Sequence, residues 1–129
     1  MLTMTFSGDI SFPDSKKAFN LFIKRLNYAL GFNSKYVWVA EKTRRGRVHY
    51  HVLFFGVRFH SIVSSCPFPF GFTFYTPCLD NPFYISKYLS KSNDFVYDLN
   101  SRIWGCSRGL FRAKKIKVPF FWMVLYLVL

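Results

Sequence analysis

Tyr36-Val-Trp-Val-Ala-Glu41-Lys-Thr-Arg-Arg-Gly46-Arg-Val-His49-Tyr50-His51-Val-Leu-Phe-Phe-Gly56 is the stretch that organises the chain. Two segments rich in β-branched and aromatic residues flank a short basic turn, which is the pattern of a β-hairpin. Because side chains alternate between the two faces of a strand, His49 and His51 are predicted to lie on the same face.

The turn decides whether Glu41 joins the two histidines. A two-residue turn at Arg45-Gly46 would pair Glu41 with Tyr50, and the carboxylate would then point to the opposite face. A three-residue loop, Arg44-Arg45-Gly46, places glycine third, where such loops require a left-handed backbone. Glu41 then lies opposite His49, with Cβ atoms roughly 5 Å apart. The position of the glycine favours this second register.

Glu41, His49 and His51 are therefore candidate ligands of one metal ion. Glu41 is the only glutamate of the chain, in a hairpin otherwise rich in Lys and Arg. Two imidazoles and one carboxylate leave coordination positions open, as in catalytic centres. Such ligands suit Mn²⁺ or Mg²⁺ and would also accept Zn²⁺ or Co²⁺. The alternative is a solvated strand face, and His60 is a further candidate ligand whose simpler interpretation is a solvated loop residue.

Composition indicates a partner for this hairpin. The 129 residues are predicted to form a single domain, residues 1–129, with no separate ATPase module. The formal charge is +12 and 22% of the residues are aromatic. Cations neutralise phosphates and rings stack on unpaired bases, so nucleic acid is the predicted partner, with an anionic membrane surface as the alternative. The predicted DNA contacts are Arg44, Arg45, Arg47, Arg102 and Arg108.

Cysteine usage and the two ends of the chain suggest a cytoplasmic protein of the host cell interior, without a membrane role. Cys66, Cys78 and Cys106 form no disulfide framework, although a Cys66–Cys78 pair stays open. The N-terminus lacks the pattern of a signal peptide. Residues 118–129 are apolar but shorter than the ~20 residues of a membrane span, so we expect a buried element or a dimer contact.

Further elements are predicted around the hairpin. Residues 2–7 form a strand with Thr3, Thr5 and Ser7 on one face. A helix begins at Lys16, capped by Asp14 or Ser15, and ends near Leu30 before Gly31. Residues 58–70 are predicted to be a loop, whereas residues 72–76 and 102–108 are predicted strands.

Residues 81–94 form a second stretch with chemical potential. Asn81 as cap and Pro82 in the first turn predict the start of a helix. Tyr84 and Tyr88 are four residues apart, as are Lys87 and Lys91, so each pair shares a helix face. The alternative is an amphipathic helix whose tyrosines pack on the sheet.

Taken together, these motifs resemble the HUH endonucleases, and within them the rolling-circle replication initiators. The motifs are His49-Tyr50-His51 with the upstream Glu41, and Tyr84-Ile-Ser-Lys87-Tyr88-Leu-Ser-Lys91. Thr5-Phe6-Ser7 is a weaker match to a first motif, and the resemblance covers roughly the first hundred residues.

The resemblance implies an α+β fold, a ferredoxin-like or RRM-like antiparallel sheet with helices packed on it. It also implies a metal-assisted transesterification of single-stranded DNA at an origin, with a 5′-phosphotyrosine link and a free 3′-OH. Because Lys91 precedes a polar turn, Tyr88 ranks first as nucleophile. Tyr84 would be the second nucleophile, or a support in a homodimer, and Lys87 and Lys91 would act on the phosphate.

The same resemblance implies an initiator of a small virus or plasmid that relies on host helicase and polymerase. One rival function is a single-tyrosine transposase of the same superfamily. The other is a non-catalytic module that binds single-stranded nucleic acid by stacking. Such a module gives no reason to cluster Glu41, His49 and His51.

Overall fold

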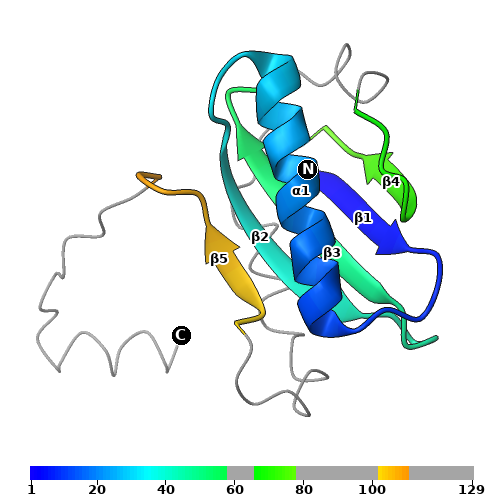
Figure 1. The fold of residues 1–129 in the computed structure, drawn as a ribbon. Helices are drawn as coiled ribbons and strands as arrows, with labels where there is room; N and C mark the ends of the chain where they lie inside the picture. Colours follow the sequence, from blue (N-terminus) through cyan, green and yellow to red (C-terminus); the bar gives the residue numbers. More distant parts are fainter. Residues whose placement is uncertain (58–65, 78–101, 111–129) are drawn as a thin grey trace, which may run out of the picture.

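The computed structural model describes residues 1–57, 66–77 and 102–110. It contains one antiparallel sheet of five strands in the order β4-β1-β3-β2-β5, and one helix, α1, lies across one face of that sheet (Figure 1). The predicted α+β class is confirmed. The elements are β1 (Leu2–Phe6), α1 (Phe12–Leu30), β2 (Lys35–Lys42), β3 (Val48–Phe55), β4 (Gly71–Tyr75) and β5 (Trp104–Cys106).

The β2–β3 turn has the predicted three-residue loop. The Thr43 N–H donates to the Arg47 carbonyl at 2.8 Å and the Gly46 N–H donates to the Thr43 carbonyl at 2.8 Å. Gly46 has φ 76°, the left-handed conformation that a side chain would disfavour. Glu41 is consequently paired with His49 in the ladder, so the alternative two-residue turn is wrong.

Helix α1 begins earlier than predicted. Its N-cap is Ser11, whose Oγ accepts the Asp14 N–H, so the predicted start at Lys16 with a cap at Asp14 or Ser15 is wrong. Pro13 is not a break here, because a first-turn proline lacks only an N–H that would have no helical partner anyway. The predicted end is confirmed: Gly31 is the C-cap, with φ 74°.

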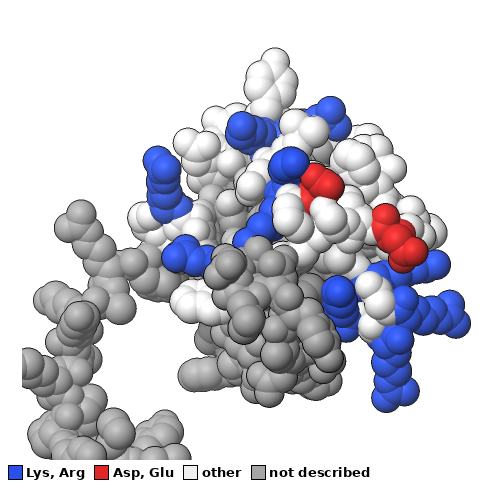
Figure 2. Space-filling view, turned by 60° about the horizontal axis from the view of Figure 1, so that its bottom comes forward, with Lys and Arg blue, Asp and Glu red and all other residues white. Residues whose placement is uncertain are grey.

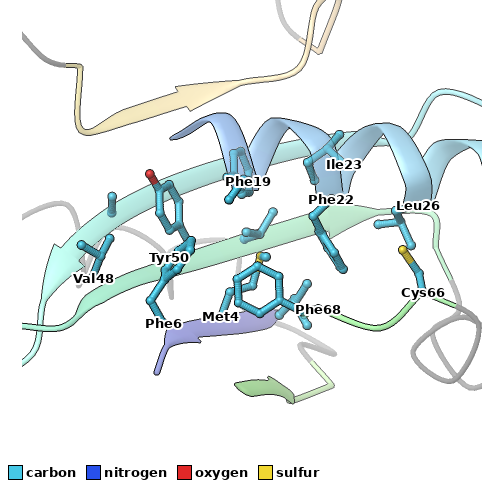
Figure 3. Close-up of a cluster of buried hydrophobic side chains, with 14 of the residues drawn as sticks. Met4, Phe6, Phe19, Phe22, Ile23, Leu26, Val48, Tyr50, Cys66 and Phe68 are labelled. Atoms are coloured by element: carbon cyan, nitrogen blue, oxygen red, sulfur yellow. The ribbon is translucent and has the colours of Figure 1, made fainter. Parts of the chain in front are cut away.

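The core lies between α1 and the sheet (Figure 3). Leu2, Met4 and Phe6 of β1 are buried there. Tyr50 of β3 stacks on Phe19 of α1 with ring centroids 4.8 Å apart. These contacts fix which face of the sheet each alternating residue occupies.

A buried pair of hydroxyls lies within this core. Tyr50 Oη is 2.9 Å from Ser15 Oγ, which in turn donates to the Phe12 carbonyl. The hydrogen bond satisfies the phenol at a position where water has no access. Burial raises the pKa of Tyr50 to about 12, so this tyrosine stays neutral.

The other expectations have mixed outcomes. The strands predicted at residues 2–7, 72–76 and 102–108 are present as β1, β4 and β5, and residues 66–70 contain no strand or helix. Cys66 and Cys106 are free thiols, so Cys66 is not paired with Cys78. In the described ranges no helix is long and apolar enough to cross a membrane. The helix predicted in 81–94, the apolar run 118–129 and His60 lie outside the described residues.

Candidate functional site

The candidate site lies on the face of the sheet opposite α1. Tyr50 points into the core, so its neighbours His49 and His51 point to the other face. On β1, Thr3 and Thr5 alternate with the core residues in the same way. Strand pairing places Thr5 beside His49 and Thr3 beside His51.

Two cross-strand rows of side chains result from the pairing on this face. The first row begins on the edge strand β4 and ends on β2, and the second extends one strand further to β5. The first row is Phe72, Thr5, His49 and Glu41, and the second row is Phe74, Thr3, His51, Val39 and Trp104.

Hydrogen bonds join the polar members of the two rows. Thr5 Oγ1 is 2.9 Å from His49 Nε2, and Thr3 Oγ1 is 3.3 Å from His51 Nδ1. Glu41 reaches diagonally across the ladder, and its Oε1 lies 2.9 Å from His51 Nε2. The two imidazole rings are stacked, with centroids 5.2 Å apart and planes 8° from parallel. The carboxylate and both imidazoles are thus within one cluster.

The contacts of His51 define its tautomer. Glu41 is an acceptor when ionised, so His51 Nε2 carries the hydrogen that lies between the two groups. His51 Nδ1 then accepts the Thr3 hydroxyl hydrogen. His51 is 5% exposed, so this arrangement is held largely away from water.

His49 is less completely satisfied. Its Nδ1 is buried and has no hydrogen-bond partner within the part of the chain that the structure describes. Burial lowers the pKa of His49, the neighbouring His51 lowers it further, and Glu41 acts in the opposite direction. A neutral imidazole with an unpartnered nitrogen offers a lone pair to a ligand when its other nitrogen carries the hydrogen.

The chemistry of this cluster fits a divalent cation. The donor set is two imidazoles and one carboxylate, and Thr3 and Thr5 supply the outer hydrogen bonds that orient metal-binding histidines. In the arrangement described here, Glu41 is occupied by His51, and no three His, Cys, Asp or Glu side chains of the described ranges are arranged to hold an ion. A cation shared by Glu41 and His51 would take the place of their hydrogen.

The sequence profile of a family of replication-associated proteins, the ORF2 type, matches residues 1–93, which include the whole cluster. The chain belongs to this family. No curated protein and no solved structure matches it.

The predicted DNA contacts of this replication-associated protein occupy two regions. Arg44 and Arg45 are exposed and Arg47 is half-buried, all in the β2–β3 turn at the end of the strands that carry Glu41 and His49. Arg102 and Arg108 are exposed on either side of the edge strand β5. Figure 2, which brings the lower end of Figure 1 forward, shows Lys and Arg side chains spread over this side and acidic ones confined to a small part of it.

The sequence did not indicate every residue that surrounds the cluster. Thr3 and Thr5 were placed on one face of a strand, but their contacts with the histidines depend on the pairing of β1 with β3, which are far apart in the chain. Phe72 and Phe74 were assigned to a strand without a face. The proposed nucleophiles and lysines of this family member, Tyr84, Tyr88, Lys87 and Lys91, lie outside the described residues.

Proposed function

We propose that this replication-associated protein is an HUH-type endonuclease that nicks and rejoins single-stranded DNA to initiate replication. The observation that carries the proposal is the contact of Glu41 with His51, beside His49, on the sheet face opposite α1. The membership of the chain in a replication-associated family supports a replication role. A carboxylate and two imidazoles on one face are a donor set for a catalytic metal rather than a feature needed for folding.

The proposed reaction is a transesterification at a phosphodiester. The phenolic oxygen of Tyr88 attacks phosphorus and the P–O3′ bond breaks. The phenol loses its proton, and the departing oxygen takes up a proton to become a free 3′-OH. The DNA 3′ of the nick stays attached as a 5′-phosphotyrosine. Attack by a 3′-OH on that link reverses the step and rejoins the strand, with Tyr84 available for a second transfer.

The residues of the cluster have defined roles in this proposal. Glu41, His49 and His51 would hold Mn²⁺ or Mg²⁺, which polarises the scissile phosphate when bound. Thr5 and Thr3 hold the two imidazoles in place through their hydroxyl groups. Lys87 and Lys91 offset the charge that develops on the phosphate. The arginines of the β2–β3 turn bind neighbouring phosphates.

A covalent-capture experiment tests the proposal without knowledge of the origin sequence. The protein is incubated with Mn²⁺ and a pool of random single-stranded DNA labelled at its 3′ end, and adducts that resist denaturant are isolated. We expect 3′-labelled strands in the adduct, and 5′-labelled strands released with an end that a polymerase extends. Sequencing the captured strands gives the cleavage site. No adduct with any metal, or an adduct that carries the 5′ label, would contradict the proposal.

Variants assign the residues. Tyr88→Phe is expected to remove most of the adduct, Tyr84→Phe to remove less, and the double variant to remove all of it. Tyr28→Phe is the matched control, because Tyr28 is 91% exposed on α1, away from the cluster. His49→Ala is expected to abolish cleavage while it leaves much of the DNA affinity, since phosphate contacts are shared among many cations. Full cleavage by His49→Ala would contradict the metal site.

The same assay distinguishes the two rival functions. A transposase of this superfamily would form the adduct at transposon ends and join the captured strand to a second, unrelated DNA. A non-catalytic module would bind the single-stranded pool without any adduct. The family membership favours replication over transposition.

A further inference from the structure

Two exposed phenylalanines flank the cluster on the edge strand β4. Phe72 is 68% exposed and Phe74 is 69% exposed, although both rings are large and apolar. They alternate with Thr73 and Tyr75, which face the α1 side, so both rings are on the face that carries His49 and His51. Single exposed apolar residues are common on proteins, but two neighbours on one strand face form a specific surface.

The strand register fixes the position of these rings relative to the cluster. Phe72 is in the row of Thr5 and His49, and Phe74 is in the row of Thr3 and His51. Each ring is therefore two strands from a histidine, about 10 Å away at the backbone. The two phenylalanines are about 7 Å apart along β4. This spacing presents two separate ring faces side by side.

The sequence of β4 supports this placement. Gly71 pairs with Phe6, and a Cβ atom at Gly71 would overlap the Thr5 carbonyl oxygen. The glycine therefore lets β4 approach β1 closely, and the next residue, Phe72, is held directly beside Thr5. The two rings are positioned by the sheet itself rather than by a loop.

Charge on this face favours a polyanion. Glu41 is the only acidic residue in the five described strands, and it is engaged with His51. The β2–β3 turn at the end of the same face carries three arginines. At the opposite edge of the sheet, Trp104 of β5 is 55% exposed in the row of His51. An anionic chain that crosses the strands would meet cations at one end and aromatic rings at both edges.

We propose that Phe72 and Phe74 are stacking sites for two unpaired bases of the single-stranded DNA, which they hold beside the Glu41–His49–His51 cluster. This inference rests on the proposed function, and it adds the selection of single-stranded over duplex DNA. Base stacking on aromatic side chains accepts any base, because every base has a π-face. The bases of a duplex are already stacked and paired, so they cannot reach these rings.

Binding measurements without metal test the proposal separately from cleavage. Anisotropy of a labelled single-stranded oligonucleotide in EDTA compares the wild type with Phe72→Ala, Phe74→Ala and the double variant. We expect about tenfold weaker binding for each single variant, since stacking of one base on an aromatic ring is worth at least that factor. Phe72→Trp and Phe74→Tyr should keep the affinity. Tyr28→Ala on α1 is the matched control and should bind like the wild type.

Two further readouts separate stacking from a general effect on the surface. The slope of log affinity against log salt should stay the same in the phenylalanine variants, because no phosphate contact is lost. Fluorescence of 2-aminopurine in the oligonucleotide should be quenched by the wild type and recover in the double variant. Circular dichroism melting of each variant verifies the fold.

The outcomes decide between the occupants. Wild-type affinity in the double variant overturns the proposal, as does an equal loss for the alanine and tryptophan variants at Phe72. A change of oligomeric state without a change of DNA affinity would assign the rings to a second copy of the chain and also overturn it. If the variants weaken binding while the wild type forms no covalent adduct, the stacking sites stand and the nicking proposal fails.

Discussion

Glu41 Oε1 lies 2.9 Å from His51 Nε2, although Glu41 is paired with His49 in the β2–β3 ladder. The carboxylate therefore reaches diagonally across the two strands and contacts the more buried imidazole. At this distance two acceptor atoms need a shared positive charge, which is a proton in the arrangement described here. The same pair of atoms can bind a cation only when that proton leaves.

We predict that divalent metal binding releases a proton from this pair. Isothermal titration calorimetry with Mn²⁺ in two buffers of different ionisation enthalpy should report a release of about one proton per bound ion near neutral pH. Glu41→Gln should weaken Mn²⁺ binding at least about tenfold, because the amide removes the anionic ligand while it keeps the shape. Binding without proton release, or wild-type affinity in Glu41→Gln, would contradict the assignment of Glu41 as a ligand.

We predict that Thr5 acts on the site through His49. Thr5→Val keeps the volume of the side chain but removes the hydroxyl that contacts His49 Nε2 at 2.9 Å. Loss of an outer hydrogen bond of this kind typically weakens metal binding about 10–100-fold. The matched control, Thr5→Ser, retains the hydroxyl and should bind Mn²⁺ like the wild type. Nitrogen-detected NMR of the imidazole should show a changed tautomer balance of His49 in Thr5→Val alone.

We predict that the arginines of the β2–β3 turn bind phosphates rather than bases. Replacing Arg44 or Arg45 by Gln should lower the slope of log affinity against log salt by about 0.7 for each lost contact with single-stranded DNA. The decrease should be the same for different oligonucleotide sequences. Arg25→Gln is the control, since Arg25 is exposed on α1, remote from the turn. An unchanged slope in the Arg44 and Arg45 variants would move the DNA path away from the turn.

Local rules sufficed for much of the hairpin and for the end of α1. Gly46 and Gly31 both need positive φ angles, and that requirement set the register and the helix end directly from the sequence. The start of α1 was wrong because Pro13 was interpreted as a break. A proline in the first turn is compatible with a helix, and Ser11 was available as its cap.

Contacts between distant strands were beyond a local pattern. The alternation of Thr3 and Thr5 predicted a shared face, but their hydrogen bonds to His51 and His49 arise from the pairing of β1 with β3. For Phe72 and Phe74, hydrophobicity alone would favour the buried face. The close approach of Gly71 to β1 fixes the opposite orientation, and only the three-dimensional register reveals it.

We predict that the conformation of Gly46 contributes to the stability of the hairpin. Gly46→Ala would place a Cβ atom at φ 76°, and we expect a loss of roughly 1 kcal/mol in the free energy of unfolding. Gly8→Ala is the control, because a Cβ atom at Gly8 meets no atom within 4 Å and its φ is not positive. Urea denaturation of the two variants gives both values. Equal stability of Gly46→Ala and the wild type would show that the loop has another conformation in solution.

We predict that stability at alkaline pH depends on Tyr50. The ordinary pKa of tyrosine is 10.0, and burial raises the pKa of Tyr50 to about 12 in the folded protein. Between these values the unfolded chain has lost the phenolic proton and the folded chain still holds it, so stability falls as the pH rises. The full contribution is present below pH 10, and roughly 2–3 kcal/mol of it is lost by pH 12.

Tyr50→Phe isolates this effect from other groups that titrate at high pH. At neutral pH the variant should be less stable by about 1 kcal/mol, because the hydrogen bond with Ser15 Oγ is lost. Its stability should then decline less steeply than that of the wild type as the pH rises above 10, and the two curves should converge. Urea denaturation at intervals from pH 7 to pH 11 measures both differences. Parallel curves would mean that water reaches the Tyr50 phenol in the folded state, contrary to the packing of Phe19 and Phe12 against its ring.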